Sequence, residues 1–530
     1  MKASILVIFL CILMITTLTV PTVGSVHPAA ESKIGLNTSQ PCSRSDWFQL
    51  QKLLASDGSG GNEFGHSVSV SGDTALIGAL GYLGKGAAYV FTYSGSSWTQ
   101  QAKLTALDGQ AGDLFGCSVS VSGGTALIGA PGRDSYKGAA YVFTRSGSNW
   151  TQQAKLTASD GAVNDYFGGS VSMAGDTALI GSPWNSDNGS AYVFTRSGSN
   201  WTLQAKVTGP DSAFNVDFGW SVFVSGDTAL IGGPGCYSGT GGAWMFTRSG
   251  SSWKLQANLF ASDGAAGDEF GKSVFVSGDT ALIGAYRRGY YTGAAYVFTY
   301  SGSSWTQQAK LTASDGQAGD DFGYSVSVSG DTALIGAYRR GYYTGAAYVF
   351  IRSGSNWTQQ AKLTASDGAV NDWFGYSVFV SGDTALIGAY GCDSYTGAAY
   401  MFIHEQQPTT PIILGSTTGK AKQPYNYTFN STDPNGDNVS YYIDWGDNNT
   451  SSWIGPYASG TLLIQSHSWA KKGSYTIKAK AKDTYGKESD WGTLMVTMPL
   501  AYEPLYHPLL KWLLERFPHA FQILRHLMGP

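Results

Sequence analysis

Charged residues are scarce in this chain, and basic runs are missing. Only 13% of its 530 residues are Asp, Glu, Lys or Arg, and the formal net charge is −4. Proteins that bind nucleic acid concentrate positive charge, because contacts to phosphate supply much of their affinity. The near balance of charge, without basic runs interleaved with aromatic residues, excludes nucleic acid as an expected partner.

Cysteine is also rare, and familiar metal and catalytic motifs are missing. None of the five cysteines forms Cys-x-x-Cys, and no histidine cluster accompanies them, which excludes a zinc site. Isolated thiols are the favoured interpretation of Cys42, Cys117, Cys236 and Cys392, with a disulfide as the alternative. Serine is abundant but never lies in Gly-x-Ser-x-Gly with plausible His and acidic partners. We therefore expect no catalytic residue and no enzymatic activity.

The N-terminus predicts export. A single Lys2 precedes an apolar run, and small residues follow near Ser25, which is the pattern of a secretory signal peptide over residues 1–25. An uncleaved membrane anchor is the alternative. Residues 26–46 are polar and mixed, and we interpret them as a linker. The expected location is therefore secreted or at the cell surface.

Glycine, by contrast, is abundant, and much of it lies in a repeat. There are 70 glycines, and the pair Phe-Gly recurs at 64, 115, 167, 218, 270, 322 and 374. Self-similarity at a fixed period of about 50 residues is typical of repeat architectures. The array occupies residues 47–403.

Each repeat predicts four β-strands. In the fifth unit, residues 273–276 alternate small and apolar side chains, and residues 280–284 are continuously apolar. Gly278-Asp279 between them suits a two-residue hairpin turn. Residues 294–298 and 305–311 supply a third strand and a more polar outermost strand. Four strands per unit of this length are typical of a β-propeller blade.

The ends of the array predict a closed ring. The last unit finishes at Phe402 without a Trp-containing fourth strand, whereas residues 47–53 form such a strand without a preceding unit. The N-terminal strand can therefore complete the seventh blade. We predict an all-β, seven-bladed propeller with four strands per blade.

The repeats resemble FG-GAP repeats, which form the propellers of integrin α-subunit heads and of secreted archaeal and bacterial surface proteins. Phe-Gly occurs in every unit, and Gly-Ala-Pro is intact at Gly129-Ala130-Pro131. The resemblance implies a ligand-binding face at one end of the propeller.

One feature of integrin-type blades is missing. Their calcium loop lies between the first two strands, where this chain has only Ser-Gly-Asp-Thr. Calcium needs six to eight oxygen ligands, more than a two-residue turn can supply. The entering loop at residues 314–321 is a weaker calcium candidate, since its Asp-Gly suits a turn. No cofactor is therefore expected, and calcium is the one alternative.

A second domain follows a linker at residues 404–411. Residues 412–498 contain alternating strands and turn clusters, which predict a small β-sandwich. Asp433-Pro434-Asn435-Gly436-Asp437, Asp444-Trp445-Gly446-Asp447 and Ala481-Lys482-Asp483 resemble PKD-like, immunoglobulin-type domains, which implies a spacer or binding unit. Asp433, Asn435 and Asp437 alternate like calcium ligands, but Asn438 replaces the glycine of a helix-flanked calcium loop, and we interpret the segment as a turn.

The C-terminal residues 501–530 have the spacing of an amphipathic helix interrupted by Pro518. Neither half is long enough to span a bilayer. Attachment to a membrane surface or envelope partner, and packing against the sandwich, both remain open.

The repeats differ most in the loop between their second and third strands, which is rich in tyrosine and arginine. Both residue types are enriched in binding hot spots. The candidate ligand-binding residues are Tyr82, Arg133, Tyr136, Trp184, Tyr237, Arg287, Arg288, Tyr290, Tyr291, Arg339, Arg340, Tyr342, Tyr343 and Tyr395. The alternative is free sequence drift, with the identity of residues 276–298 and 328–350 reflecting recent duplication.

The sequence thus favours an exported binding or adhesion protein that engages glycan or protein. An extracellular polysaccharide hydrolase or lyase that uses the propeller channel, and a structural envelope component, are the alternatives. Asn-x-Ser/Thr sites for glycosylation in an exported chain begin at Asn37, Asn149, Asn188, Asn200, Asn356, Asn426, Asn430, Asn438, Asn448 and Asn449.

Overall fold

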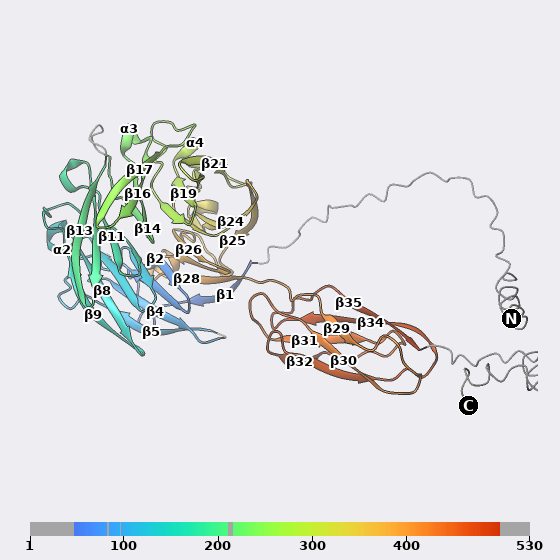
Figure 1. The fold of residues 1–530 in the computed structure, drawn as a ribbon. Helices are drawn as coiled ribbons and strands as arrows, with labels where there is room; N and C mark the ends of the chain where they lie inside the picture. Colours follow the sequence, from blue (N-terminus) through green and yellow to red (C-terminus); the bar gives the residue numbers. More distant parts are fainter. Residues whose placement is uncertain (1–46, 82–83, 96, 210–215, 499–530) are drawn as a thin grey trace, which may run out of the picture. The chain divides into compact units, whose positions relative to one another are not determined.

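The computed structural model describes residues 47–81, 84–95, 97–209 and 216–498 (Figure 1). The expected signal peptide, the linker at 26–46, the C-terminal helix, Tyr82, Asn37 and Cys42 lie outside these residues. Among the described helices, none is both long and apolar enough to cross a membrane.

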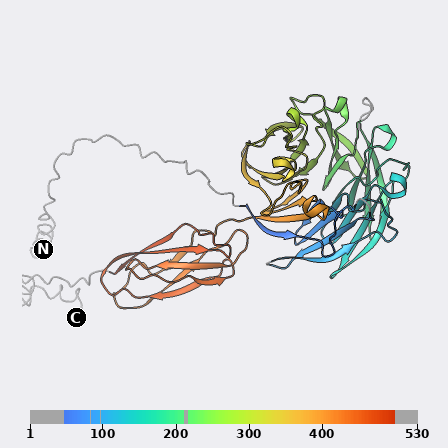
Figure 2. The same ribbon diagram turned by 180° about the vertical axis from the view of Figure 1, so that it is seen from behind.

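The described residues of the repeat array form seven antiparallel four-stranded sheets, as the sequence predicts (Figures 1 and 2). The first strands contact one another in sequence around the ring and line its axis. They are β2 (Phe64–Ser71), β6 (Val119–Ser122), β10 (Ser170–Ala174), β14 (Ser221–Ser225), β18 (Val274–Ser277), β22 (Val326–Ser329) and β26 (Ser377–Ser381). The second strands are β3 (Thr74–Ala79), β7 (Thr125–Ala130), β11 (Thr177–Ser182), β15 (Thr228–Gly233), β19 (Thr280–Ala285), β23 (Thr332–Ala337) and β27 (Thr384–Ala389).

The two outer strands of each blade complete the sheets. The third strands are β4 (Ala87–Tyr93), β8 (Ala139–Ser146), β12 (Ser190–Ser197), β16 (Gly242–Ser249), β20 (Ala294–Tyr300), β24 (Ala346–Ser353) and β28 (Ala398–His404). The outermost strands are β5 (Trp98–Leu104), β9 (Asn149–Leu156), β13 (Asn200–Thr208), β17 (Ser252–Leu259), β21 (Trp305–Leu311), β25 (Asn356–Leu363) and β1 (Trp47–Leu53).

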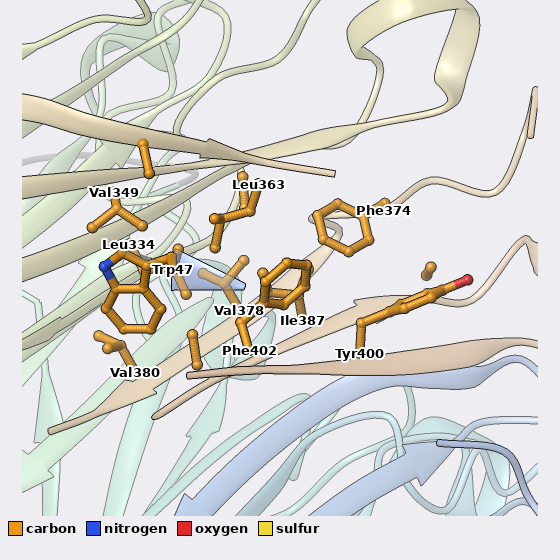
Figure 3. Close-up of a cluster of buried hydrophobic side chains, with 14 of the residues drawn as sticks. Trp47, Leu334, Val349, Leu363, Phe374, Val378, Val380, Ile387, Tyr400 and Phe402 are labelled. Carbon is orange, nitrogen blue, oxygen red and sulfur yellow. The ribbon is translucent and has the colours of Figure 1, made fainter. Parts of the chain in front are cut away.

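The N-terminal strand closes the ring, which confirms the prediction from the ends of the array. β1 pairs antiparallel with β28, so the last sheet runs β1-β28-β27-β26. The Ser377 hydroxyl donates to the Gly65 carbonyl at 2.8 Å, which joins the last blade to the first. Figure 3 shows the Trp47 indole near Leu334, Val349 and Val380, so the closing strand also fills a hydrophobic core.

Neighbouring blades are joined by a repeated hydrogen bond at the outer strands. The Trp305 indole N–H donates to the Gln256 side-chain oxygen of the preceding blade at 3.0 Å. A β-bulge between Val297 and Phe298 interrupts the alternation expected along β21. Each second strand is buried throughout or nearly so, because it lies between two strands of its own sheet and against the neighbouring blades.

Residues 412–498 form the expected β-sandwich. One sheet contains β29 (Ile412–Gly415), β30 (Tyr425–Asn430) and β33 (Leu463–His467). The other contains β32 (Ile454–Tyr457), β31 (Val439–Asp444), β34 (Gly473–Lys482) and β35 (Gly492–Met498). Alternate residues of facing strands, among them Tyr427, Tyr441 and Ile477, pack around the buried Trp469.

Candidate ligand-binding face

The variable loops lie at the same end of the blades as the Phe-Gly pairs. In the fifth blade, antiparallel pairing places Val274, at the start of β18, opposite Ile283, near the end of β19. Six of these loops contain a short helical turn within the described residues: α2 (Arg133–Tyr136), η1 (Asn185–Asp187), α3 (Cys236–Gly239), α4 (Arg288–Tyr291), α5 (Arg340–Tyr343) and α6 (Cys392–Tyr395). One face therefore carries both kinds of loop.

Tyrosines on these turns are strongly exposed. Tyr290 and Tyr342 are 90% and 86% exposed, and each has a φ of 57°. A left-handed backbone costs a residue with a Cβ roughly 1–2 kcal/mol. Exposed aromatic side chains on strained turns are consistent with a binding surface. Large exposed side chains also occur at Tyr136, Trp184, Tyr237, Tyr291, Tyr343 and Tyr395.

Three of the candidate arginines hold the loops in place. The Arg288 guanidinium contacts Asp268 at 2.7 Å and Asp263 at 3.1 Å, both in the entering loop of the same blade. Arg340 makes the equivalent contacts in the sixth blade. Arg133 is buried and contacts Asp113 at 2.9 Å. These guanidinium groups are engaged within their own blades.

Arg287 and Arg339 have a different environment. Arg287 pairs with Glu269 at 2.5 Å, and Arg339 lies 3.1 Å from the buried Asp321 carboxylate. Each guanidinium also lies over two tyrosine rings, which for Arg287 are Tyr286 and Tyr291. Both side chains remain partly exposed, so they can contact a ligand.

Sequence reasoning missed a set of side chains around the axis. The residue after each Phe-Gly pair lies within the innermost strand of the first blade and one or two residues before that strand in the other blades. These residues are His66, Cys117, Gly169, Trp220, Lys272, Tyr324 and Tyr376. Lys272 Nζ lies 4.0 Å from the Trp220 ring centroid, and the Tyr324 and Tyr376 hydroxyls are 3.1 Å apart. The sequence did contain a signal for this set: all seven repeats have Phe-Gly-x-Ser, and the residue at x differs between most of them.

Burial shifts several pKa values at this end of the axis. Burial lowers the pKa of Lys272 to about 8, although the charge of Glu269 opposes the shift. Burial also lowers the pKa of His66 to about 4. The pKa of Asp321 is raised to about 6 by burial, against the charge of Arg339. Groups with perturbed pKa values are concentrated at functional sites.

The entering loops are structural and do not fit a calcium site. The Tyr348 hydroxyl donates to Asp315 at 2.8 Å, and Lys362 donates to the same carboxylate at 2.6 Å. Asp320 in this loop pairs with Arg340. Basic side chains of the protein therefore already neutralise Asp315 and Asp320. A calcium site would need these carboxylates to be free to bind the ion.

A cleft of about 600 Å³ lies at the first and last blades of this face. Its lining includes Glu63, Lys85, Lys103 and Tyr395. Tyr395 is the candidate residue among them, so the cleft connects the predicted loop surface with charged groups of the first blade.

The glycosylation candidates occupy several environments. Asn149, Asn200 and Asn356 begin outermost strands and are exposed, as are Asn426, Asn438, Asn448 and Asn449. Asn188 is half-buried, and the Asn430 amide donates to the Gly460 carbonyl at 2.8 Å.

Comparison with known proteins identifies both domain types. The FG-GAP repeat model matches residues 47–91, 98–143, 150–194, 201–246, 253–298, 305–350 and 357–402. The PKD domain model matches residues 414–496. Human integrin alpha-X is 26% identical over 226 residues, which are 38% of this chain and 19% of that protein. The chain thus spans about a fifth of that relative's length.

Solved structures also share similarity with parts of the chain. The PKD domain of an M14-like peptidase from Thermoplasmatales archaeon SCGC AB-540-F20 is 57% identical, with a TM-score of 0.18, covering 18% of this chain and 99% of that one. The glycoside hydrolase domain of Endo-D from Streptococcus pneumoniae R6 is 14% identical, with a TM-score of 0.15, covering 42% of this chain and 34% of that one.

Proposed function

Because the chain belongs to the FG-GAP repeat family, we propose that it is an exported binding protein whose propeller engages a glycan or protein through the loop face. FG-GAP and PKD domains are typical of extracellular proteins. The exposed Tyr290 and Tyr342 carry the proposal, since they present large rings to solvent on adjacent blades. Tyrosine combines contact area, hydrogen bonding and low entropy cost, which suits both sugar rings and protein surfaces.

A binding assay on the purified chain tests this proposal. We expect retention on one member of a panel of immobilised neutral and anionic polysaccharides and purified cell-surface proteins. The double variant Tyr290→Ala/Tyr342→Ala should bind at least about 10-fold more weakly, since each ring is expected to contribute more than about 1 kcal/mol. Arg287→Ala/Arg339→Ala should also weaken binding, because these guanidinium groups lie beside the same tyrosines.

The matched control is Leu203→Ala/Leu255→Ala, which removes exposed apolar side chains from the outermost strands β13 and β17. It should bind like the wild type. Retention by a polysaccharide identifies a glycan ligand, and retention by a protein identifies a protein ligand. Equal binding by the tyrosine variant and the wild type would refute the assignment of the loop face.

A polysaccharide hydrolase or lyase is the second candidate function. It is favoured by Lys272, whose lowered pKa of about 8 makes it a candidate base beside Tyr324 at the mouth of the axis. Release of new ends from a panel of polysaccharides, followed by loss of turnover in Lys272→Met, would support this function. Absence of product from every polysaccharide would reject it without affecting the binding proposal.

A further inference from the structure

Four carboxylates gather where the chain leaves the last blade and enters the sandwich. Glu405 directly follows β28, Asp433 and Asp437 lie in the loop between β30 and β31, and Asp483 directly follows β34. One carboxylate oxygen each of Glu405, Asp433 and Asp437 lies within 4.8 Å of the others. Segments distant in sequence thus place acidic groups at ligand spacing.

Several of these oxygens are buried without a hydrogen-bond partner. Glu405 is only 1% exposed, and both of its carboxylate oxygens are buried and unpartnered. Asp433 and Asp483 are each 5% exposed, and the Oδ2 atom of each is likewise unpartnered. A buried carboxylate without a partner is costly, and burying several together adds mutual repulsion. The charge of Lys487 acts on Glu405, but these buried oxygens accept no hydrogen bond.

The remaining oxygens hold the aspartates in fixed orientations. Asp433 Oδ1 accepts the backbone N–H groups of Asn435 and Asp437, which forms the turn that the sequence predicts. Asp483 Oδ1 accepts the backbone N–H groups of Tyr485 and Lys487. In both residues the loop therefore binds one oxygen and leaves the other available to the cluster.

The segment that carries Glu405 is also held in place. The Gln406 N–H donates to Asn435 Oδ1 at 2.8 Å, and Asn435 Nδ2 donates to the His404 carbonyl at 3.1 Å. Asn435 is thus used to hold the segment. Glu405 and Asp437 also line a cavity of about 280 Å³, which offers an entry path for a small ion.

We propose that Glu405, Asp433 and Asp437 bind a calcium ion that links the end of the propeller to the sandwich. Carboxylate oxygens are the ligands that calcium prefers, and the set contains no nitrogen or sulfur that would favour a transition metal. Calcium also accepts irregular geometry and bidentate carboxylates, whereas magnesium requires a near-ideal octahedron. Burial, followed by the charges of Asp437, Asp483 and Asp433, raises the pKa of Glu405 to about 8, although the charge of Lys487 opposes the shift.

This site differs from the calcium loops that integrin-type blades carry between their first two strands. Its ligands come from the segment after the last blade and from the loop between β30 and β31 of the PKD domain. Because the ion would bind only the assembled junction, it should stabilise the folded chain in proportion to its concentration. Removal of calcium would then loosen the connection between the loop face and the rest of the exported chain.

Isothermal titration calorimetry and thermal unfolding of the calcium-stripped chain test the proposal. The wild type should bind one calcium ion per chain, and its Tm should rise by roughly 5 °C at calcium concentrations 100-fold above Kd. Glu405→Gln removes a ligand charge but preserves shape, so it should lose calcium binding and the Tm increase. In EDTA the same variant should be at least as stable as the wild type, because it removes a buried like charge.

Asp490→Asn is the control, since it removes an exposed charge from the same domain. It should bind calcium like the wild type. Magnesium should bind at least about 10-fold more weakly than calcium. A wild type that binds no calcium, or a Glu405→Gln variant with an unchanged Tm increase, would overturn the proposal. A Glu405→Gln variant less stable than the wild type in EDTA would also overturn it, because the glutamate would then be a structural contact.

Discussion

Two glycines of the same repeat motif should respond very differently to alanine substitution. Gly278 lies in the hairpin turn with a φ of 57°, and a Cβ added there meets nothing within 4 Å. Gly284 lies in β19, where an added Cβ would be 1.9 Å from the Gly323 carbonyl oxygen of the next blade. The first glycine serves a turn, and the second permits close approach of two blades.

The magnitudes follow from these environments. Gly278→Ala should cost about 1–2 kcal/mol, the penalty for a left-handed residue with a Cβ. Gly278→Asn should cost less, because asparagine tolerates this conformation. Since Cβ atoms essentially never approach within 3.0 Å of another heavy atom, Gly284→Ala must displace backbone of the adjacent blade by about 1 Å. For Gly284→Ala we expect the free energy of unfolding to fall by more than about 4 kcal/mol, which is typical of severe steric or packing defects.

Equilibrium unfolding in urea, followed by tryptophan fluorescence, measures both losses. Gly336→Ala provides a replicate, because its added Cβ would lie 2.0 Å from the Gly375 carbonyl oxygen. The urea concentration at the midpoint of unfolding should fall slightly for Gly278→Ala and by a much larger amount for Gly284→Ala and Gly336→Ala. If the free energies of unfolding of Gly284→Ala and Gly278→Ala differ by less than about 1 kcal/mol, close approach of the blades is not the reason for a glycine at position 284.

Three further predictions concern closure, pH and thiol chemistry. Trp47→Ala should cost about 3–5 kcal/mol, and more than Trp305→Ala at the equivalent, more exposed position; equal losses in urea unfolding would contradict closure through a packed indole. Burial raises the pKa of Asp321 to about 6, so the contribution of this carboxyl to stability should fall as pH rises from about 4 to 6, where only the folded carboxyl keeps its proton. Asp321→Asn should therefore gain on the order of 2 kcal/mol relative to the wild type between pH 4 and pH 7, and the same difference at both pH values would refute this. Burial raises the pKa of Cys236 to about 11, so mass spectrometry should show iodoacetamide labelling at pH 8 only after unfolding; rapid labelling of the native chain would contradict it.

The fold was largely predictable because each repeat states the same local pattern. Strand bounds in the fifth unit agree with the structure within about two residues, since apolar periodicity and Gly-Asp turns are local signals. Ring closure was also predictable, because one Trp-containing strand stands at the N-terminus and one is missing after Phe402. The three described cysteines are free thiols, in agreement with their irregular spacing.

The roles of the loop residues were less predictable. Arg287 and Arg288 are adjacent in sequence, yet Arg288 contacts two aspartates of the entering loop and Arg287 lies beside Tyr286 and Glu269. Composition identifies both as candidate contacts, but partners more than 15 residues away decide which one is available to a ligand. Whether any candidate residue binds a ligand stays a prediction that the proposed variants test.

The sequence by itself determined the seven blades, their closing strand and the PKD domain, because each depends on periodicity or on residues close together in the chain. Only the tertiary structure decided which side chains share one environment. It brought the residues after each Phe-Gly pair to the axis, and it gathered Glu405, Asp433 and Asp437 at the end of the last blade. The physical reason is that desolvation and charge act between groups close in space, and the spacing of residues along the chain does not encode that proximity.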